Sequence, residues 1–314
     1  MPDMRAKYLT LAGLLQAAAI ATVLVSIVTS VDFVHRYFEL FSHFRLQYLV
    51  ISLLLLVAFA IRRSTYYTAL LLAVTVLHSS YALPWYFGGV QAAGSPTLTI
   101  IHANVHANND QYGRLLALVE AEDADIVFLQ EVTPAWEHAL QPLHDDYRYT
   151  HVQARDDYFG IAMFSRVPLD TIRQVSSPPL DYPTIVASLS VAGNALTVIN
   201  THPMIPLGRA NYAARNAQLR SIADLVAQTD GAVILTGDLN TGMWGSNYRQ
   251  LIRSTGLTNA SRGFGILPTW PTFMPLAMIP IDHVMVSSEV GVSDIRTGPH
   301  IGSDHLPLIV TVAL

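Results

Sequence analysis

The sequence predicts two packed mixed β-sheets flanked by helices, preceded by an all-α transmembrane domain of three helices. Three observations support this fold class. Residues 1–96 contain long apolar runs, whereas residues 97–314 have an ordinary globular composition. The second part contains many short apolar segments of strand length with few helices between them, a pattern that favours packed sheets. Many of these segments also end in polar residues, which indicates a candidate site where the strands end.

Three apolar stretches, at about residues 9–30, 40–61 and 66–84, predict the transmembrane domain over residues 1–90. Each is close to the ~20 residues that the core of a bilayer requires. The first could alternatively be a cleaved signal peptide, but its length and the spans that follow favour a helix that stays in the chain. The polar residues of this part are too few to cover three such helices in water. We therefore expect an integral, multi-pass membrane protein.

Basic residues in the short loops predict the orientation in the membrane. Arg5 and Lys7 precede the first span, and Arg62 with Arg63 fills the turn between the second and the third. If both lie in the cytoplasm, three spans place the following domain on the extracytoplasmic side, which is the periplasm of a Gram-negative cell. Residues 91–96 (QAAGSP) predict a short linker that keeps this domain close to the bilayer.

Composition excludes several kinds of chemistry. The chain has no cysteine, so a disulfide framework, a thiol nucleophile and a zinc–thiolate site are excluded. Residues 97–314 contain 12 Lys and Arg against 20 Asp and Glu, a formal charge of −8. Such a domain has no general electrostatic attraction for a nucleic-acid backbone.

The predicted elements of residues 97–314 follow from hydrophobic patterning. A favoured turn pair, Gly193-Asn194, predicts a hairpin. The expected strands cover residues 98–105, 125–131, 158–166, 184–191, 195–201, 232–235, 281–287 and 308–312, and the expected helices lie around 115–119 and over 210–228.

Polar side chains stand at the ends of most of these strands. If the strands share one core, their ends can meet at one edge, where carboxylates, amides and imidazoles would hold a hard cation and an anionic substrate. Some of these residues could instead form turns or caps. Glu131 is harder to explain in that way, because an unpaired carboxylate after the apolar VFLQ segment is costly to bury. The residues are Asn104, Glu131, His202, Asp238, Asn240, Asp282, His283, Asp304 and His305.

In this pattern the domain resembles the endonuclease/exonuclease/phosphatase superfamily, which has the deoxyribonuclease I-like fold. Each short motif is weak alone, but QE, GDxN and SDH at these separations form a specific combination that extends over essentially all of 97–314. The resemblance implies a four-layer α/β sandwich and a phosphodiesterase or phosphatase that depends on Mg²⁺ or Mn²⁺, with Ca²⁺ as an alternative. The matching pieces are Asn104, Leu129-Gln130-Glu131, Tyr158 to Ala162 with Ser165-Arg166, Thr201-His202, Gly237 to Asn240, Ile281-Asp282-His283 and Gly302 to His305.

The resemblance also implies roles at the metal. Glu131 is expected to bind the metal ion with Asn104 beside it, and Asp304 to add a direct or water-mediated contact. No residues for any other cofactor are indicated. His283 stands where many relatives have an aromatic residue, and we expect it outside the group that contacts metal or substrate.

The remaining roles concern the attacking water and the phosphate. The resemblance implies that Asp238 orients or deprotonates the water and that Asn240 holds this water or a phosphoryl oxygen. His305, oriented by Asp282, would stabilise charge on the phosphate or transfer a proton. The family divides on whether His305 or Asp238 is the base, and both assignments remain open. Two further candidate donors to the phosphate are His202 and Tyr158.

Two apolar, proline-rich loops bear on the substrate: residues 202–208 and residues 268–280. Both are expected at the rim of the site, where they could contact lipid or pack over their own domain. Arg209 and Arg215 could meet a headgroup, although we expect them to be solvated on the surface.

We therefore expect the substrate to be a lipid-linked or membrane-associated phosphoester, met at the bilayer surface. An extracytoplasmic nuclease or nucleotide phosphatase is the alternative, which the acidic balance and the lack of a basic, aromatic groove disfavour. A non-catalytic membrane scaffold is a second alternative, which the intact motif set disfavours. No obligate protein partner is indicated.

Overall fold

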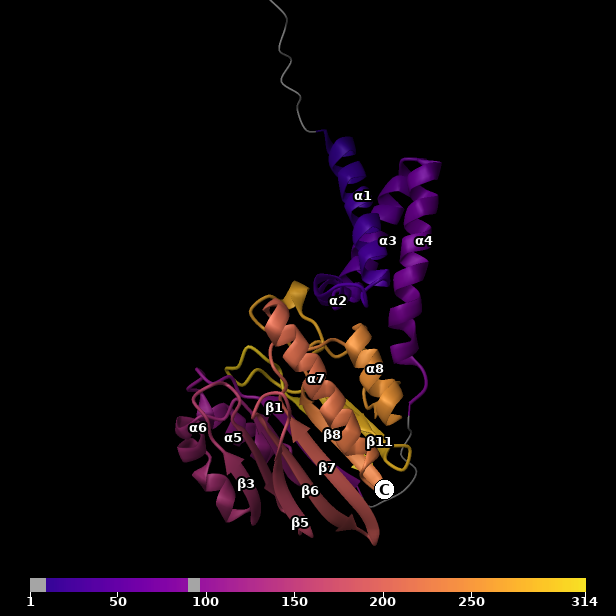
Figure 1. Cartoon of the computed structure of the whole chain (residues 1–314). Coiled ribbons are helices and arrows are strands. Elements are labelled where there is room, and N and C mark those ends of the chain that lie inside the picture. Colours follow the sequence, from indigo (N-terminus) through magenta and orange to yellow (C-terminus); the bar gives the residue numbers. More distant parts are fainter. Residues whose placement is uncertain (1–9, 90–96) are drawn as a thin grey trace, which may run out of the picture. The chain divides into compact units, whose positions relative to one another are not determined.

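A computed structural model describes residues 10–89 and 97–314, and the chain divides into two compact units, residues 1–83 and 84–314 (Figure 1). The predicted linker 91–96 lies outside the described residues, as do Arg5 and Lys7, on which the predicted orientation partly depends.

The first unit is helical, as expected. Two runs of helix in the described residues are long and apolar enough to cross a membrane, α1 and the run Thr65–Tyr86 made by α4 and η1. The expected continuous helix over 40–61 is wrong, because α2 and α3 meet at a bend of 64°. Only if this bent pair counts as one span does the unit hold three candidates. The helices of the unit are α1 (Leu11–Ser30), α2 (Arg36–Ser42), α3 (Arg45–Ile61) and α4 (Thr65–Ala82), and the short 3-10 helix η1 (Leu83–Tyr86) begins at its last residue and continues into the second unit.

Side-chain hydrogen bonds connect the helices of this unit. Ser26 Oγ on α1 lies 2.9 Å from His78 Nε2 on α4, and Thr75 on α4 donates to Ser52 on α3 over 3.0 Å. Polar contacts of this kind hold apolar helices together where hydrophobic contrast between them is weak.

Two six-stranded sheets form the second unit. In each sheet one central pair is parallel, β1–β2 in the first and β7–β8 in the second, and the other pairs are antiparallel. The first sheet has the order β11-β12-β1-β2-β4-β3 and the second β5-β6-β7-β8-β10-β9. The strands are β1 (Thr97–Asn104), β2 (Ile126–Gln130), β3 (Tyr149–Gln153), β4 (Ile161–Ser165), β5 (Thr171–Ser176), β6 (Pro183–Val191), β7 (Asn194–Thr201), β8 (Ala232–Asp238), β9 (Thr258–Asn259), β10 (Asp282–Val286), β11 (Gly291–Thr297) and β12 (Leu308–Ala313).

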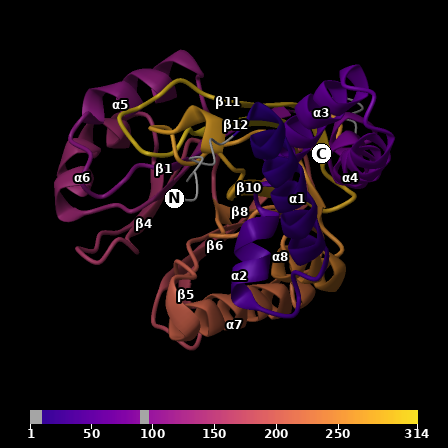
Figure 2. The same cartoon turned by 90° about the horizontal axis from the view of Figure 1, so that it is seen from above.

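Helices cover the outer faces of both sheets (Figures 1 and 2). Helices α5 (Tyr112–Ala121) and α6 (Pro134–Ala139) pack on the first sheet, and α7 (Gly208–Ala227) and α8 (Ser246–Thr255) lie along the second. The short 3-10 helices η2 (Gln141–Asp145) and η3 (Pro275–Ala277) lie in connecting segments. This arrangement confirms the four-layer α/β sandwich.

Alternation along the strands explains how an apolar core leads into a polar site. Ile100 on β1 and Ile234 on β8 belong to the core between the two sheets. Because side chains on one face recur every second residue, His102 and Asn104 continue the inner face of β1, and Asp238 continues that of β8. The space between the sheets therefore changes from apolar to polar at one end.

Local geometry corrects two details of the expected strands. The hairpin turns at Ala192 and Gly193, both with positive φ, and β7 already begins at Asn194. The strand expected from residue 158 begins only at Ile161, because Tyr158 has φ +68° and leaves the extended conformation. Gly160 completes this departure, since a Cβ there would stand 1.9 Å from the carbonyl oxygen of Val132.

Candidate active site

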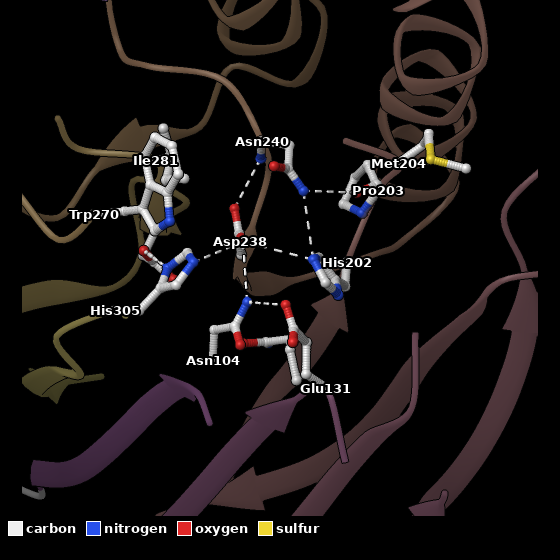
Figure 3. Close-up of polar contacts among 12 residues, drawn as sticks. Asn104, Glu131, His202, Pro203, Met204, Asp238, Asn240, Trp270, Ile281 and His305 are labelled. Atoms are coloured by element: carbon white, nitrogen blue, oxygen red, sulfur yellow. Dashed lines mark hydrogen bonds and ion pairs between the residues drawn. The ribbon is translucent and has the colours of Figure 1, made fainter. Parts of the chain in front are cut away.

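Strand direction brings the predicted residues together. The carboxyl ends of the parallel pairs β1–β2 and β7–β8 point to the same edge of the sandwich, and the antiparallel strands β10 and β12 begin there (Figure 3). Asp282 at the start of β10 lies opposite Asp238 at the end of β8. The segment before β12 is held at Asn104, whose carbonyl accepts from Ser303 Oγ over 2.8 Å.

Asn104 joins two carboxylates. Its Nδ2 donates to Glu131 Oε1 over 3.0 Å and to Asp238 Oδ2 over 3.2 Å. Glu131 Oε2 accepts from the backbone N–H of Ala107 over 2.9 Å. Glu131 has φ +61°, a strained value that turns its side chain out of the strand alternation and toward Asn104. Glu131, the carboxylate predicted at the end of β2, therefore has a backbone conformation that directs its side chain into the site.

Asp304 is reached by two residues that the sequence did not single out. Trp270 Nε1 donates to Asp304 Oδ2 over 2.9 Å. His106 Nδ1 lies 3.3 Å from Asp304 Oδ1 and 3.7 Å from Glu131 Oε2, so its imidazole faces both predicted metal ligands. No motif could have revealed these contacts, since Trp270 belongs to a rim loop and His106 to a turn after β1.

Asp238 is surrounded by further predicted residues. The backbone N–H of Asn240 donates to Asp238 Oδ1 over 2.9 Å, and His202 Nε2 lies 3.5 Å from Asp238 Oδ2. The side chain of Asn240 donates to the carbonyl of Pro203 over 3.0 Å. Arg215 is fully buried, and its Nη1 donates to the carbonyl of Asn240 over 2.7 Å. The expectation of a solvated Arg215 was wrong, because α7 packs this face against the loop that follows β8.

His305 and Asp282 form a buried pair. His305 Nδ1 donates to Asp282 Oδ2 over 2.8 Å, and His305 Nε2 lies 3.7 Å from Asp238 Oδ2. Burial by itself lowers the pKa of His305, but the carboxylates of Asp282 and Asp238 outweigh it and raise this pKa to about 10. Burial opposes ionisation of Asp282, yet His305 and His102 hold its pKa below the ordinary range. The pair is therefore an imidazolium and a carboxylate at neutral pH.

Two residues of the motif lie apart from this cluster. Tyr158 is exposed, and its hydroxyl accepts from Asn108 Nδ2 over 3.3 Å rather than meeting a carboxylate. His283 lies on the other face of β10, where its Nε2 donates to the carbonyl of Thr241 over 2.8 Å and its Nδ1 accepts from Asn259 over 3.1 Å. Burial lowers the pKa of His283 to about 4, so this imidazole is neutral.

The donor set fits a divalent cation. Glu131, Asp238 and Asp282 are buried carboxylates. Asp304 Oδ1 is buried and makes no hydrogen bond within the described residues, although His106 Nδ1 lies 3.3 Å from it. The His305 imidazolium does not by itself balance this charge, and a hard cation with oxygen ligands would. In the described part of the chain, Asp238, Asp282 and His305 have donor atoms within 4.8 Å of one another. Both Asp282 oxygens already accept imidazole N–H groups. The carboxylate oxygens of Glu131 and Asp304 therefore fit a cation better than those of Asp282.

The α/β sandwich with buried carboxylates and imidazoles at one edge fits a divalent cation, and comparison with known proteins shows the family. The model of the endonuclease/exonuclease/phosphatase family matches residues 101–305, and the chain belongs to this family. The protein is therefore a metal-dependent hydrolase of phosphoester bonds. No curated protein sequence gives a significant match.

Solved structures share the fold at low sequence identity. TDP2 of D. rerio, complexed with a single strand DNA product, is 19% identical at a TM-score of 0.60, over 70% of this chain and 100% of that chain. An endonuclease/exonuclease/phosphatase from Beutenbergia cavernae is 19% identical at 0.57, over 70% and 72%. A beta toxin from Staphylococcus aureus is 16% identical at 0.52, over 68% and 99%.

The neutral, buried His283 predicts acid sensitivity of the fold. Its pKa of about 4 lies below the ordinary 6.5, so the unfolded chain binds a proton first as the pH falls. The resulting loss of stability begins below pH 6.5 and amounts to about 2 kcal/mol between pH 7 and pH 5. Urea unfolding of wild type and His283→Gln across this range measures it. The variant should be less stable at pH 7 and show a flatter dependence, and parallel curves for both proteins would contradict the assignment.

Proposed function

We propose that the protein is anchored in a membrane and hydrolyses a lipid-linked or membrane-associated phosphoester at the extracytoplasmic face. The observation that carries this proposal is the exposure of apolar side chains in the two loops beside the site. The alternative function is an extracytoplasmic nuclease or nucleotide phosphatase. The D. rerio TDP2 structure contains a DNA product, so DNA is included among the substrates to be tested.

Both rim loops are attached to the site at their bases and apolar at their tips. Pro203 accepts from Asn240, and Trp270 donates to Asp304; the two lie on opposite sides of Asp238 (Figure 3). Beyond these anchors, Leu207 in the first loop is 68% exposed and Phe273 in the second is 69% exposed. Within the described residues 97–314, the exposed large hydrophobic side chains are Tyr158, Ile205, Leu207, Phe264, Phe273, Met274 and Leu276, and five of these seven belong to the two loops.

Charge supports a lipid over a polyanion. Neither loop contains a charged residue between 203 and 208 or between 268 and 280, and residues 97–314 are acidic overall. Exposed apolar side chains beside a buried polar site suit a substrate with an apolar body and a phosphate head, since each part then meets matching chemistry. A nucleic acid would need basic side chains along its backbone.

The apolar helices support the anchoring. Helix α1 and the run Thr65–Tyr86 have the length and composition of membrane spans, and the bent α2–α3 pair would supply the third. Arg62 and Arg63 in the turn before α4 favour a cytoplasmic position for this turn and an extracytoplasmic catalytic domain. Protease added to sealed right-side-out vesicles should then digest residues 97–314, and complete protection of this domain would overturn the orientation.

We assign the metal ion to Glu131, Asn104 and Asp304, with Mg²⁺ as the expected species. When bound, it would polarise the phosphoryl group and offset its developing charge. Asp238 orients the attacking water and accepts its proton.

The imidazoles serve the phosphate. His305 carries its proton toward Asp238 and the substrate, because Asp282 holds Nδ1 and leaves Nε2 facing the site. This assignment makes His305 the charge-stabilising acid and Asp238 the base. Asn240 and His202 lie on the other side of Asp238, where they can donate to a phosphoryl oxygen.

A parallel assay separates the candidate substrates. Purified full-length protein in detergent with Mg²⁺ is given phospholipids in mixed micelles, nucleotides, and single- and double-stranded DNA. Turnover of a phospholipid or another lipid-linked phosphate is expected to dominate. Preferential turnover of DNA or of a nucleotide would overturn the lipid proposal and favour the alternative function.

The rim loops give a sharper prediction. Replacing Phe273 and Leu276 by Ser removes two exposed apolar side chains, and kcat/KM on lipid in vesicles should fall about tenfold. Hydrolysis of soluble bis(p-nitrophenyl) phosphate should stay within twofold, because the carboxylates are untouched. Phe264→Ser, an exposed phenylalanine outside both loops, is the matched control and should leave both activities unchanged. Equal losses on both substrates would count against lipid contact.

A further inference from the structure

A row of buried polar side chains lies behind Asp282, between the two sheets. His102 on β1, Gln130 on β2 and Asn200 on β7 are all fully buried, and the motif assignment gives none of them a role. They continue the inner faces of their strands, where apolar side chains would pack at lower cost. These three side chains form a chain of hydrogen bonds that reaches Asp282, so they contact the site from behind.

Asn200 determines the direction of the hydrogen bonds. Its Nδ2 lies 3.4 Å from the carbonyl oxygen of Leu129 and 3.2 Å from that of Ala162. Carbonyl oxygens only accept, so the amide of Asn200 must present its NH₂ group to them. Its Oδ1 then faces Gln130, and the Gln130 amide must donate to it.

The same logic fixes the tautomer of His102. Gln130 Nε2 also lies 3.3 Å from His102 Nδ1, so this ring nitrogen accepts and carries no proton. The proton of the neutral ring is then on Nε2, which lies 3.0 Å from Asp282 Oδ1. His102 therefore donates to one oxygen of Asp282 while His305 donates to the other over 2.8 Å.

We propose that His102 is a positioning residue for the hydrolytic step, acting through Asp282 on His305. Asp282 is a fully buried carboxylate with one histidine donor on each oxygen, and two fixed donors leave it one rotamer. Without His102, one oxygen loses its donor and the carboxylate can turn. His305 Nε2 then no longer points steadily at the region of Asp238, where the phosphate reacts. The proposal concerns the hydrolytic step and does not depend on the lipid assignment.

Replacement of His102 tests the proposal. Full-length His102→Leu, His102→Gln, Asp282→Asn and the double variant of His102→Leu with Asp282→Asn are assayed on bis(p-nitrophenyl) phosphate with saturating Mg²⁺. His102→Leu should lower kcat between about tenfold and a hundredfold with KM within about twofold. His102→Gln places an amide donor near the position of Nε2 and should recover most of the loss. The double variant should be no slower than Asp282→Asn alone, because both changes act through one carboxylate.

His283→Gln is the matched control. This substitution removes another buried histidine, which lies on β10 and makes two hydrogen bonds. Because the His283 side chain faces away from the site, kcat should stay within twofold of wild type. Thermal unfolding of every variant separates loss of fold from loss of positioning. His102→Leu with an intact fold and kcat within twofold of wild type would overturn the proposal, as would losses that multiply in the double variant.

A second measurement does not require a folded Leu variant. ¹⁵N NMR of the histidine-labelled wild-type protein at neutral pH should show the His102 proton on Nε2, with Nδ1 unprotonated. A proton on Nδ1 would reverse the hydrogen bond with Gln130 and remove the donor to Asp282, which would overturn the proposal.

Discussion

Replacing Asp238 by Asn should lower kcat by about 1,000-fold or more, the largest effect expected for a single substitution in this protein. Asp238 is the carboxylate on which the two halves of the site meet. Asn104 donates to it over 3.2 Å, and His202 and His305 approach it to 3.5 Å and 3.7 Å. Asn has the same shape but cannot accept the proton of the attacking water.

Stability separates this loss from misfolding. The Asp238→Asn variant keeps the shape of the side chain and should still unfold in one cooperative transition, although it gives up one acceptor, for Asn104 or for the N–H of Asn240. Initial rates on bis(p-nitrophenyl) phosphate with saturating Mg²⁺, together with thermal unfolding, measure both effects. Asp294→Asn on the edge strand β11 is the control for a lost carboxylate and should be silent. Residual activity within tenfold of wild type would remove Asp238 from the role of base.

Glu131→Gln should lower activity about 100-fold or more at millimolar Mg²⁺, and higher Mg²⁺ should restore part of it. Glu131 is held by Asn104 over 3.0 Å and by the N–H of Ala107 over 2.9 Å, so the neutral variant keeps its place but binds the cation weakly. Chelation by EDTA should abolish wild-type activity, and added Mg²⁺ should recover it.

The Mg²⁺ concentration for half-maximal rate is the diagnostic quantity. It should rise in Glu131→Gln and stay unchanged in Glu289→Gln, an exposed carboxylate in the turn between β10 and β11. A rate loss with an unchanged Mg²⁺ dependence would move the metal away from Glu131. Unchanged biological activity of both Glu131→Ala and Asp238→Ala would favour the non-catalytic scaffold instead.

Local patterns predicted two packed sheets flanked by helices and the polar residues at strand ends, whereas the four-layer sandwich and Tyr158 followed from the family resemblance. Apolar strands that end at Glu131 or Asp238, or begin at Asp282, carry their own signal, because an isolated buried carboxylate is costly. Strands β1 and β8 also alternate between their two faces, and this alternation places Asn104 and Asp238 on the inner faces. Such features depend on neighbours in the chain and can be read without knowing strand order.

Element boundaries were less predictable. The bend between α2 and α3 and the turn at Ala192 and Gly193 each shifted an expected boundary. Tyr158 belongs to the same motif as the strand that follows it, yet its positive φ places it outside that strand. Backbone conformations of this kind depend on packing around single residues and leave little trace in hydropathy.

The amino-acid sequence by itself determined that apolar helices precede an α/β domain and that polar residues end its strands. Only the tertiary structure decided which of these residues become partners. His102 and Asp282 are 180 positions apart and meet because β1 and β10 face each other across two sheets. Tertiary packing likewise buries Arg215 and brings Trp270 to Asp304. Strand order and register are set by the whole core, so long-range pairs follow from the assembled sandwich and from no local segment.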